Sequence, residues 1–226
     1  MMGEKMRRLG AALWVTILVS LPLSPSPVRA STLSVDLLSG GSPAPFAQPP
    51  RTGGWQFALS NSQRVTALGF WDEGGDGLEK SHQVGIWTDA GALLGSIVVD
   101  NGGTTIGSAH TGGNWIFVTL GAAIPLGPGT YRIGGVLDTD LQRHQLTGQV
   151  PFLIESFAPE VTWLNAAFGP GFGGFVFPSS LSSQDGFYGP NMVLAPAVPE
   201  PSTLLLVGIG LGALVYRRRR SAGNRS

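Results

Sequence analysis

The sequence predicts an all-β protein, built as a single β-sandwich with jelly-roll-like topology. Two observations carry this prediction. Glycine accounts for 34 of the 226 residues while charged residues make up only 12%, and this pairing favours short strands joined by many turns. Between the two ends of the chain, no segment keeps a helical apolar period, whereas several short segments alternate or are apolar throughout.

Six segments in the middle of the chain have this strand pattern and are separated by turn-forming residues. They are Trp55–Ser60, Arg64–Trp71, His82–Asp89, Leu93–Val99, Asn114–Leu120 and Thr130–Leu137. Separators such as Gly127-Pro128-Gly129 are turn sequences. We expect a further short strand at Thr32–Leu37, a closing strand at Asn191–Ala195, and a long loop at Gly169–Gly174.

One domain between two appendages is the predicted organisation, as suits a chain of 226 residues. Residues 31–54 contain four prolines among small residues, which predicts a linker or a loosely ordered lead-in. Regular structure is expected to begin at Trp55, so the sandwich domain is predicted to span residues 55–196.

Residues 1–30 have the pattern of a secretory signal peptide. Lys5, Arg7 and Arg8 form a positive region, and an apolar run from Leu9 to Leu21 follows it. Val28-Arg29-Ala30 has residues that are small or tolerated just before a signal-peptide cleavage site, and we expect cleavage after Ala30. The alternative is an uncleaved anchor helix, which the shortness of the apolar run disfavours.

The C-terminal end has three parts in order. Val198-Pro199-Glu200-Pro201 comes first, an unbroken apolar stretch at 204–216 follows, and Arg217–Arg220 precede a short end at 221–226. The apolar stretch predicts a helix of roughly 20 Å against a hydrocarbon core of roughly 30 Å, and therefore a marginal, transient membrane anchor. Arginines just past an apolar segment stay on the cytoplasmic side of the membrane. We therefore expect residues 221–226 on the cytoplasmic side and the Pro-Glu-Pro on the outer side.

This tail, over residues 197–220, resembles the PEP-CTERM sorting signal. The resemblance implies a Gram-negative bacterium, export through the inner membrane, and an exosortase that recognises the tail and cuts near the Pro-Glu-Pro. The motif is carried by Val198, Pro199, Glu200, Pro201, Arg217, Arg218, Arg219 and Arg220. Its prolines fix an extended backbone that a protease-like site can grip. An ordinary tail anchor with a chance Pro-Glu-Pro is the alternative.

The middle of the chain, from Gly54 to Pro196, also resembles a known group. Leu68-Gly69-Phe70-Trp71-Asp72, Gly75-Asp76-Gly77-Leu78 and Ser81–Trp87 follow one another as in a β-rich domain of unknown function that is common in PEP-CTERM proteins. This resemblance supports the sandwich prediction. It implies no activity, because that group has no established biochemistry to carry over.

Charge and cysteine content exclude several functional classes. Residues 31–200 hold 13 acidic and 5 basic residues, a net charge of −8, while both ends of the chain are basic. Nucleic-acid recognition needs a basic surface, so nucleic acid is excluded as a partner. The chain has no cysteine, which excludes disulfides, thiol catalysis and thiolate metal sites.

The loop Asp72-Glu73-Gly74-Gly75-Asp76-Gly77 is the strongest candidate for a binding site. Asp72 and Asp76 are the predicted metal ligands, with calcium as the cation, because carboxylates interleaved with glycines can wrap a hard ion. The spacing does not match an EF-hand. A solvated hairpin turn is the alternative. Asp138 and Asp140 would complete the site if the fold brings them near.

No catalytic residue is assigned from the sequence. His82, His110 and His144 are too widely separated for a local metal cluster, and His82, at a strand start, is expected to make a structural hydrogen bond. No Gly-x-Ser-x-Gly elbow is present, although a Ser-His-Asp arrangement of separated residues stays open. Most tryptophans are expected in the core, with an exposed sugar-stacking platform as the alternative. They are Trp55, Trp71, Trp87, Trp115 and Trp163.

Three hypotheses of function follow. The favoured one is an exported surface or extracellular-matrix protein, not an enzyme, whose partners are exosortase and, transiently, the inner membrane. The second is a carbohydrate-binding module of the exopolysaccharide matrix, assisted by calcium. The third is a secreted hydrolase, which requires a cleft with convergent titratable groups.

Overall fold

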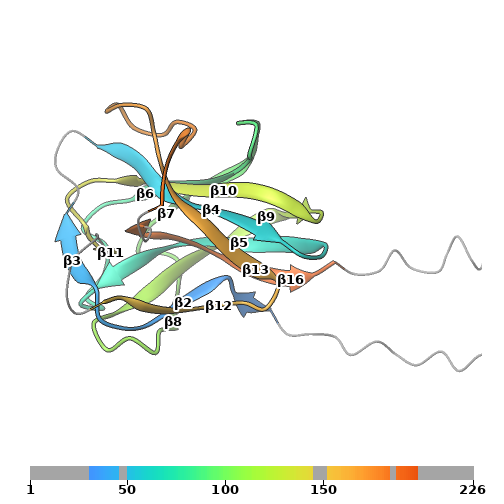
Figure 1. Ribbon diagram of the computed structural model, residues 1–226. Helices are drawn as coiled ribbons and strands as arrows, with labels where there is room; N and C mark the ends of the chain where they lie inside the picture. The colour runs from blue at the N-terminus through green and yellow to red at the C-terminus, as the bar shows by residue number, and fades with distance from the viewer. Residues whose placement is uncertain (1–30, 46–49, 145–151, 184–186, 198–226) are drawn as a thin grey trace, which may run out of the picture.

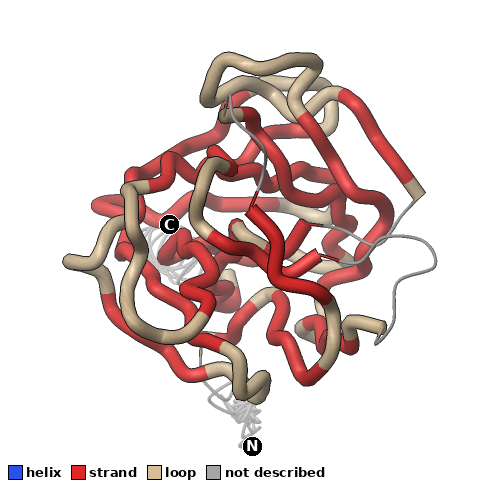
Figure 2. Tube along the Cα trace, turned by 90° about the vertical axis from the view of Figure 1, so that its left-hand side faces the viewer, coloured by secondary structure: helices blue, strands red, loops and turns tan. Residues whose placement is uncertain are grey.

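The computed structural model describes residues 31–45, 50–144, 152–183 and 187–197, and these form strands, turns and loops without a helix (Figure 2). The all-β prediction is confirmed. Among these residues there is accordingly no helix that could cross a membrane. The predicted signal peptide at 1–30 and the tail from residue 198 onward lie outside the described residues.

Two large antiparallel sheets make up most of the domain. The five-stranded sheet has the order β1 (Thr32–Leu33), β16 (Pro190–Pro196), β5 (Gln63–Glu73), β9 (Gly113–Leu126) and β8 (Thr104–Gly107). The six-stranded sheet has the order β14 (Ser180–Ser182), β13 (Val161–Phe168), β4 (Arg51–Leu59), β10 (Gly129–Leu137), β6 (His82–Thr88) and β7 (Leu93–Val99).

Two smaller sheets flank the large ones. One joins β15 (Phe187–Tyr188), β11 (Leu141–His144) and β3 (Ser42–Pro45), and the other joins β12 (Ile154–Phe157) and β2 (Val35–Ser39). The consecutive pairs β4–β5, β5–β6 and β9–β10 each cross from one large sheet to the other. Because of these crossings, loops that are far apart in the sequence lie together where the strands of the two sheets end.

The large sheets stack face to face around one core (Figure 1). Phe70 of β5 lies flat on His82 of β6, with ring centroids 3.8 Å apart and planes 2° from parallel. Gly135 of β10 leaves room for this stack, because a Cβ there would lie 3.1 Å from the Phe70 ring. Trp55 Nε1 on β4 donates to the carbonyl oxygen of Pro190 on β16 at 3.2 Å, a second link between the layers.

Each of the six central strands predicted from the sequence is present, and most are longer than predicted. β9 continues from Leu120 to Leu126 because its last residues pair with Gln63 and Val65, beyond an irregularity in the ladder. β4 begins at Arg51 rather than at Trp55. Its Gly54 packs closely, since a Cβ there would lie 2.2 Å from the carbonyl oxygen of Ile133.

The stretch 31–54, expected to be a linker or lead-in, contains β1, β2, β3 and the start of β4. Val35 and Leu37 of β2 are fully buried, and β2 pairs with β12. The prolines suggested a loose segment, but the strands at its described residues pair with strands from the second half of the domain. The closing strand expected at Asn191–Ala195 corresponds to β16.

The loop at Gly169–Gly174 and the residues that follow it cover the outer face of the six-stranded sheet. Phe175 packs on Trp87 with ring centroids 4.9 Å apart, and Arg132 Nη1 donates to the carbonyl oxygen of Pro178 at 2.8 Å. Tryptophan burial follows the core interpretation for Trp55, Trp71 and Trp115, which are fully buried in the core. Trp87 is 3% exposed but packs against Phe175 outside that core, and Trp163 is partly buried against it.

Candidate functional site

The loop from Gly74 to Ser81, which joins β5 to β6, forms one wall of a pocket of about 410 Å³. Five of the nine residues that line the pocket are acidic and none is basic. The lining residues are Trp71, Asp72, Glu73, Asp76, Gly77, Leu78, Glu79, Asp140 and Leu141. The candidate metal ligands Asp72 and Asp76 therefore line the same pocket as Asp140, one of the two residues expected to complete the site if the fold brought them near; the other, Asp138, does not line it.

Asp72 is not part of a solvated hairpin turn. It is 4% exposed, and the strands on either side of the loop belong to different sheets, so the loop is a crossover. Both carboxylate oxygens of Asp72 accept from the backbone N–H of Gly77, at 3.2 and 3.1 Å. Gly77 adopts a φ of 102°, which favours glycine, and this conformation turns the backbone back toward the carboxylate.

Like charges crowd the pocket. Burial raises the pKa of Asp72 above its usual value, and the neighbouring carboxylates of Asp76, Asp140 and Glu73 raise it further, while the hydrogen bond from Gly77 acts in the opposite direction. A carboxyl whose ionised form is disfavoured in this way is stabilised by a bound cation, because the cation supplies the missing opposite charge.

Glu73, beside Asp72, is neutralised from within the protein. Its Oε2 accepts from Arg143 Nε at 2.8 Å and from Trp71 Nε1 at 2.7 Å, and Arg143 Nη2 bonds its other oxygen. Arg143 Nη1 also donates to the carbonyl oxygens of Gly40 and Gly41, both at 3.2 Å. This ion pair is mostly buried and ties β5, β11 and the segment after β2 together.

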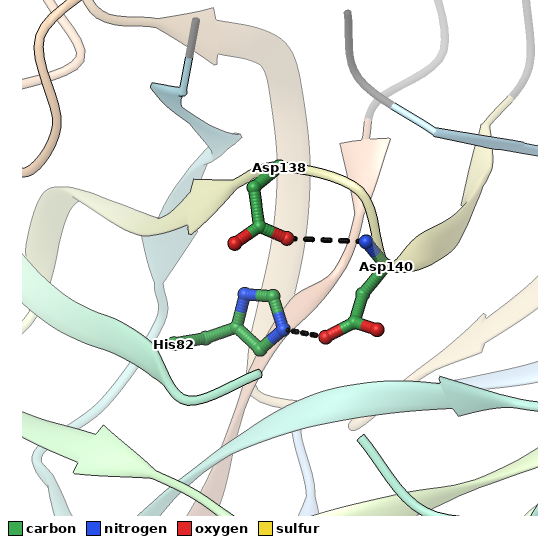
Figure 3. Close-up of side chains that lie close together, drawn as sticks. All are labelled: His82, Asp138 and Asp140. Atoms are coloured by element: carbon green, nitrogen blue, oxygen red, sulfur yellow. Dashed lines mark hydrogen bonds and ion pairs between the residues drawn. The ribbon is translucent and has the colours of Figure 1, made fainter. Parts of the chain in front are cut away.

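His82, Asp138 and Asp140 lie close together (Figure 3), and Asp140 is also one of the residues that line the pocket. His82 Nε2 lies 2.5 Å from Asp140 Oδ2, and Asp138 Oδ1 accepts from the backbone N–H of Asp140 at 3.1 Å. Asp140 also accepts the backbone N–H groups of Glu79 and Lys80, at 3.0 and 3.1 Å. Asp140 therefore holds the pocket loop to the start of β6.

The hydrogen bonds of His82 constrain its protons. Its Nδ1 lies 2.7 Å from the carbonyl oxygen of Val136, which can only accept, so Nδ1 carries a hydrogen. Its Nε2 bonds the Asp140 carboxylate, so both ring nitrogens of His82 are engaged in hydrogen bonds. The structural hydrogen bond expected for His82 is confirmed.

His82, Asp138 and Asp140 each offer a potential metal-ligating atom, and these atoms lie within 4.8 Å of one another. Both ring nitrogens of His82 already have partners and its side chain is fully buried. We therefore interpret these three residues as a structural lock. The pocket that Asp140 lines together with Asp72 and Asp76 presents carboxylate oxygens. It therefore suits a hard divalent cation better than a metal that prefers nitrogen ligands.

Sequence reasoning identified part of this site. Asp72 and Asp76 were predicted, and Asp140 was conditional on the fold; Asp138 faces the lock and is not among the pocket-lining residues. Glu79 was missed, and its only signal was its position two residues after the glycine-rich loop. The predicted sorting residues Val198, Pro199, Glu200, Pro201, Arg217, Arg218, Arg219 and Arg220 lie outside the described residues.

Ser108, His110 and Asp36 lie together but are not arranged for nucleophilic catalysis. Ser108 Oγ donates to Asp36 at 2.6 Å. The His110 ring accepts from the backbone of Gly112 at 2.8 Å and pairs with the carbonyl oxygen of Gly40 at 3.1 Å. Neither ring nitrogen of His110 is therefore positioned to take the proton of Ser108, which a serine nucleophile would require.

Comparison with known proteins identifies the tail. Residues 197–220 match the PEP-CTERM protein-sorting motif. No curated protein matches the chain, and no solved structure does. The chain thus carries a PEP-CTERM sorting motif, which indicates an exported surface protein that is targeted to an exosortase and held transiently at the membrane before display.

Proposed function

We propose that this chain is a non-catalytic surface or extracellular-matrix protein of a Gram-negative bacterium, whose jelly-roll-like β-sandwich is released to the cell exterior after exosortase processing. The sorting motif at residues 197–220 is the observation that carries the proposal. The net charge of −8 over residues 31–200 supports it, because acidic domains are soluble and resist association with nucleic acid.

Several polar contacts inside the domain fit a structural role. Glu73 pairs with Arg143, His82 pairs with Asp140, and the partly buried Asp36 accepts from Ser108. Each of these contacts joins segments at least 58 residues apart and so helps to fix the fold. Asp72, Asp76 and Asp140 do converge on one pocket, and their carboxylates suit a bound cation there.

Substitution of Glu200 by Ala is expected to abolish processing, because Glu200 is the single carboxylate of the motif and stands between two prolines, which favour an extended backbone. Intact-mass measurement of the surface-exposed protein should show loss of both ends from the wild type and retention of the C-terminal arginines in Glu200→Ala. Glu160→Gln, a carboxylate change within the domain, is the matched control and should be processed normally. Surface-exposed wild-type protein that keeps Arg217–Arg220 would contradict the proposal.

A second candidate function is divalent-cation binding in the acidic pocket, with calcium as the proposed ion. The specific observation is that Asp72, Asp76 and Asp140 line one pocket, and that none of the residues lining this pocket is basic. This feature also supports the carbohydrate-binding hypothesis in its calcium-assisted form. The proposed tryptophan platform has less support, because none of the tryptophans in the described part of the chain is exposed.

Calcium is expected to raise the unfolding temperature of the isolated domain. At dissociation constants of about 0.1–1 mM, which are typical of extracellular calcium modules, about 10 mM calcium would add roughly 1–3 kcal/mol to the free energy of unfolding. Asp76→Asn should lose most of this shift, while Glu160→Gln keeps it. Differential scanning calorimetry with and without a chelator measures the effect, and an unchanged melting temperature would reject the cation site.

A further inference from the structure

Both ends of the described domain lie at one pole. β1 begins at Thr32, whose partner in the ladder is Leu194, and β16 ends at Pro196, whose partner is Gln63. The turn before Gln63 is therefore next to the last residues of β16, which reach the right-hand side of the domain in Figure 1. Gln63 also pairs with Leu126, so the turns at Ser60–Ser62 and Gly127–Pro128 lie at the same end. We call this end of the domain the inner pole.

The acidic pocket lies at the opposite end, which we call the outer pole. β5 runs from Gln63 at the inner pole to Glu73 in the pocket wall, and eleven strand residues cover roughly 30 Å. β10, in the other sheet, runs the same way. It starts at Gly129, beside the inner-pole turn, and ends at Leu137, just before Asp140. Two strands, one from each sheet, thus separate the pocket from the chain ends.

The connection between the domain and the predicted membrane segment is short. Seven residues separate Pro196 from Leu204, the first residue of the apolar stretch. The eight Cα–Cα steps between them span at most about 29 Å when fully extended. β16 also lies between β1 and β5, so the strand that carries the sorting tail cannot lengthen this connection without breaking two ladders of the five-stranded sheet. The inner pole is therefore held close to the membrane whenever the tail is in it.

Electrostatics favours the same orientation. The pocket at the outer pole is lined by acidic side chains and by no basic one, although Glu73 and Asp140 are paired with Arg143 and His82. A membrane surface that contains anionic lipids carries a negative potential that extends over about a Debye length. Turning the pocket toward the lipid would bring like charges together. Placing the inner pole toward the lipid avoids this repulsion. It is also the orientation that the short connection between Pro196 and Leu204 favours.

We infer that the membrane-held protein stands on its β1–β16 pole and presents the acidic pocket away from the lipid, toward the medium. The pocket's partner is then a solute or matrix component of the cell exterior and not a lipid headgroup of the same membrane. This inference rests on the membrane-held stage of the proposed function, and it is independent of which cation the pocket takes.

The absence of cysteine from the chain permits a direct test with single introduced cysteines. Ser62→Cys labels the inner pole and Ser81→Cys labels the pocket loop; both positions are exposed, so each variant should melt as the wild type does. Each full-length variant carries a fluorophore and is reconstituted into phosphatidylethanolamine–phosphatidylglycerol vesicles whose headgroups bear a nitroxide. Quenching at Ser62→Cys is expected to be several-fold stronger than at Ser81→Cys.

Equal quenching at the two positions, or stronger quenching at the pocket loop, would overturn the orientation while leaving the display proposal intact. Failure of the full chain to associate with vesicles would instead overturn the membrane-held stage itself, and the orientation with it. Asn61→Cys and Glu79→Cys, also exposed and one at each pole, provide a second pair if either first label perturbs folding. Asn61→Cys should behave as Ser62→Cys, and Glu79→Cys as Ser81→Cys.

Discussion

Arg143→Ala is expected to lower the free energy of unfolding by about 3–5 kcal/mol, the range found when one partner of a buried ion pair is removed. The substitution leaves the mostly buried Glu73 carboxyl group without its ion-pair partner and close to Asp72, whose pKa is already raised by burial. It also removes a donor to the carbonyl oxygens of Gly40 and Gly41, of which that of Gly40 keeps its bond to His110. Urea unfolding followed by fluorescence of the buried tryptophans measures the loss.

Arg64→Ala is the matched control, since Arg64 is a half-buried arginine at the other end of β5 and should cost about 1 kcal/mol or less. A double-mutant cycle with Glu73→Gln isolates the pair, and coupling of at least about 1 kcal/mol is expected for groups in direct contact. Equal losses for Arg143→Ala and Arg64→Ala, without coupling to Glu73, would show that the ion pair does not stabilise the fold.

His82→Ala is expected to lower the free energy of unfolding by a similar amount, about 3–4 kcal/mol. It removes the ring that stacks on Phe70 and leaves the Asp140 carboxylate without its only side-chain partner among the described contacts. Because Asp140 holds the backbone N–H groups of Glu79 and Lys80, the pocket loop should also open more often. Hydrogen exchange at these two amides should then quicken more than exchange across β4.

His82→Phe separates the two contributions. It keeps an aromatic ring against Phe70 but cannot pair with Asp140, so it should recover part of the packing energy and none of the protection of the pocket loop. If the Glu79 and Lys80 amides stay as protected in both variants as in the wild type, Asp140 does not act through His82. The lock would then be only a packing contact.

The sequence was sufficient for the features whose signal is local. Alternation and turn residues predicted the central strands, and β7 has the predicted bounds, Leu93–Val99. A strand's period of two appears directly in the order of its residues. The PEP-CTERM motif at residues 197–220 was also predictable, because a sorting signal is recognised as a short linear segment and needs no tertiary contact to be complete.

The sequence alone did not indicate where the lead-in would pair. Proline and glycine predicted a loose segment up to Gly54, yet Val35 and Leu37 are buried in β2, and Gly53–Gly54 belong to β4. Local propensity gives way when a strand partner is available elsewhere in the chain, and here those partners are β10, β12 and β13, all later in the sequence.

The sequence by itself thus determined the all-β class, the central strands, the acidic character of the domain and the sorting tail. Only the tertiary structure decided that Asp72 and Asp140 share a pocket, that Glu73 is neutralised by Arg143, and that the pocket stands opposite the chain ends. The physical reason is separation. Glu73 and Arg143 are 70 residues apart, and which side chains meet at that distance depends on how strands cross between sheets, a choice settled by packing of the whole core.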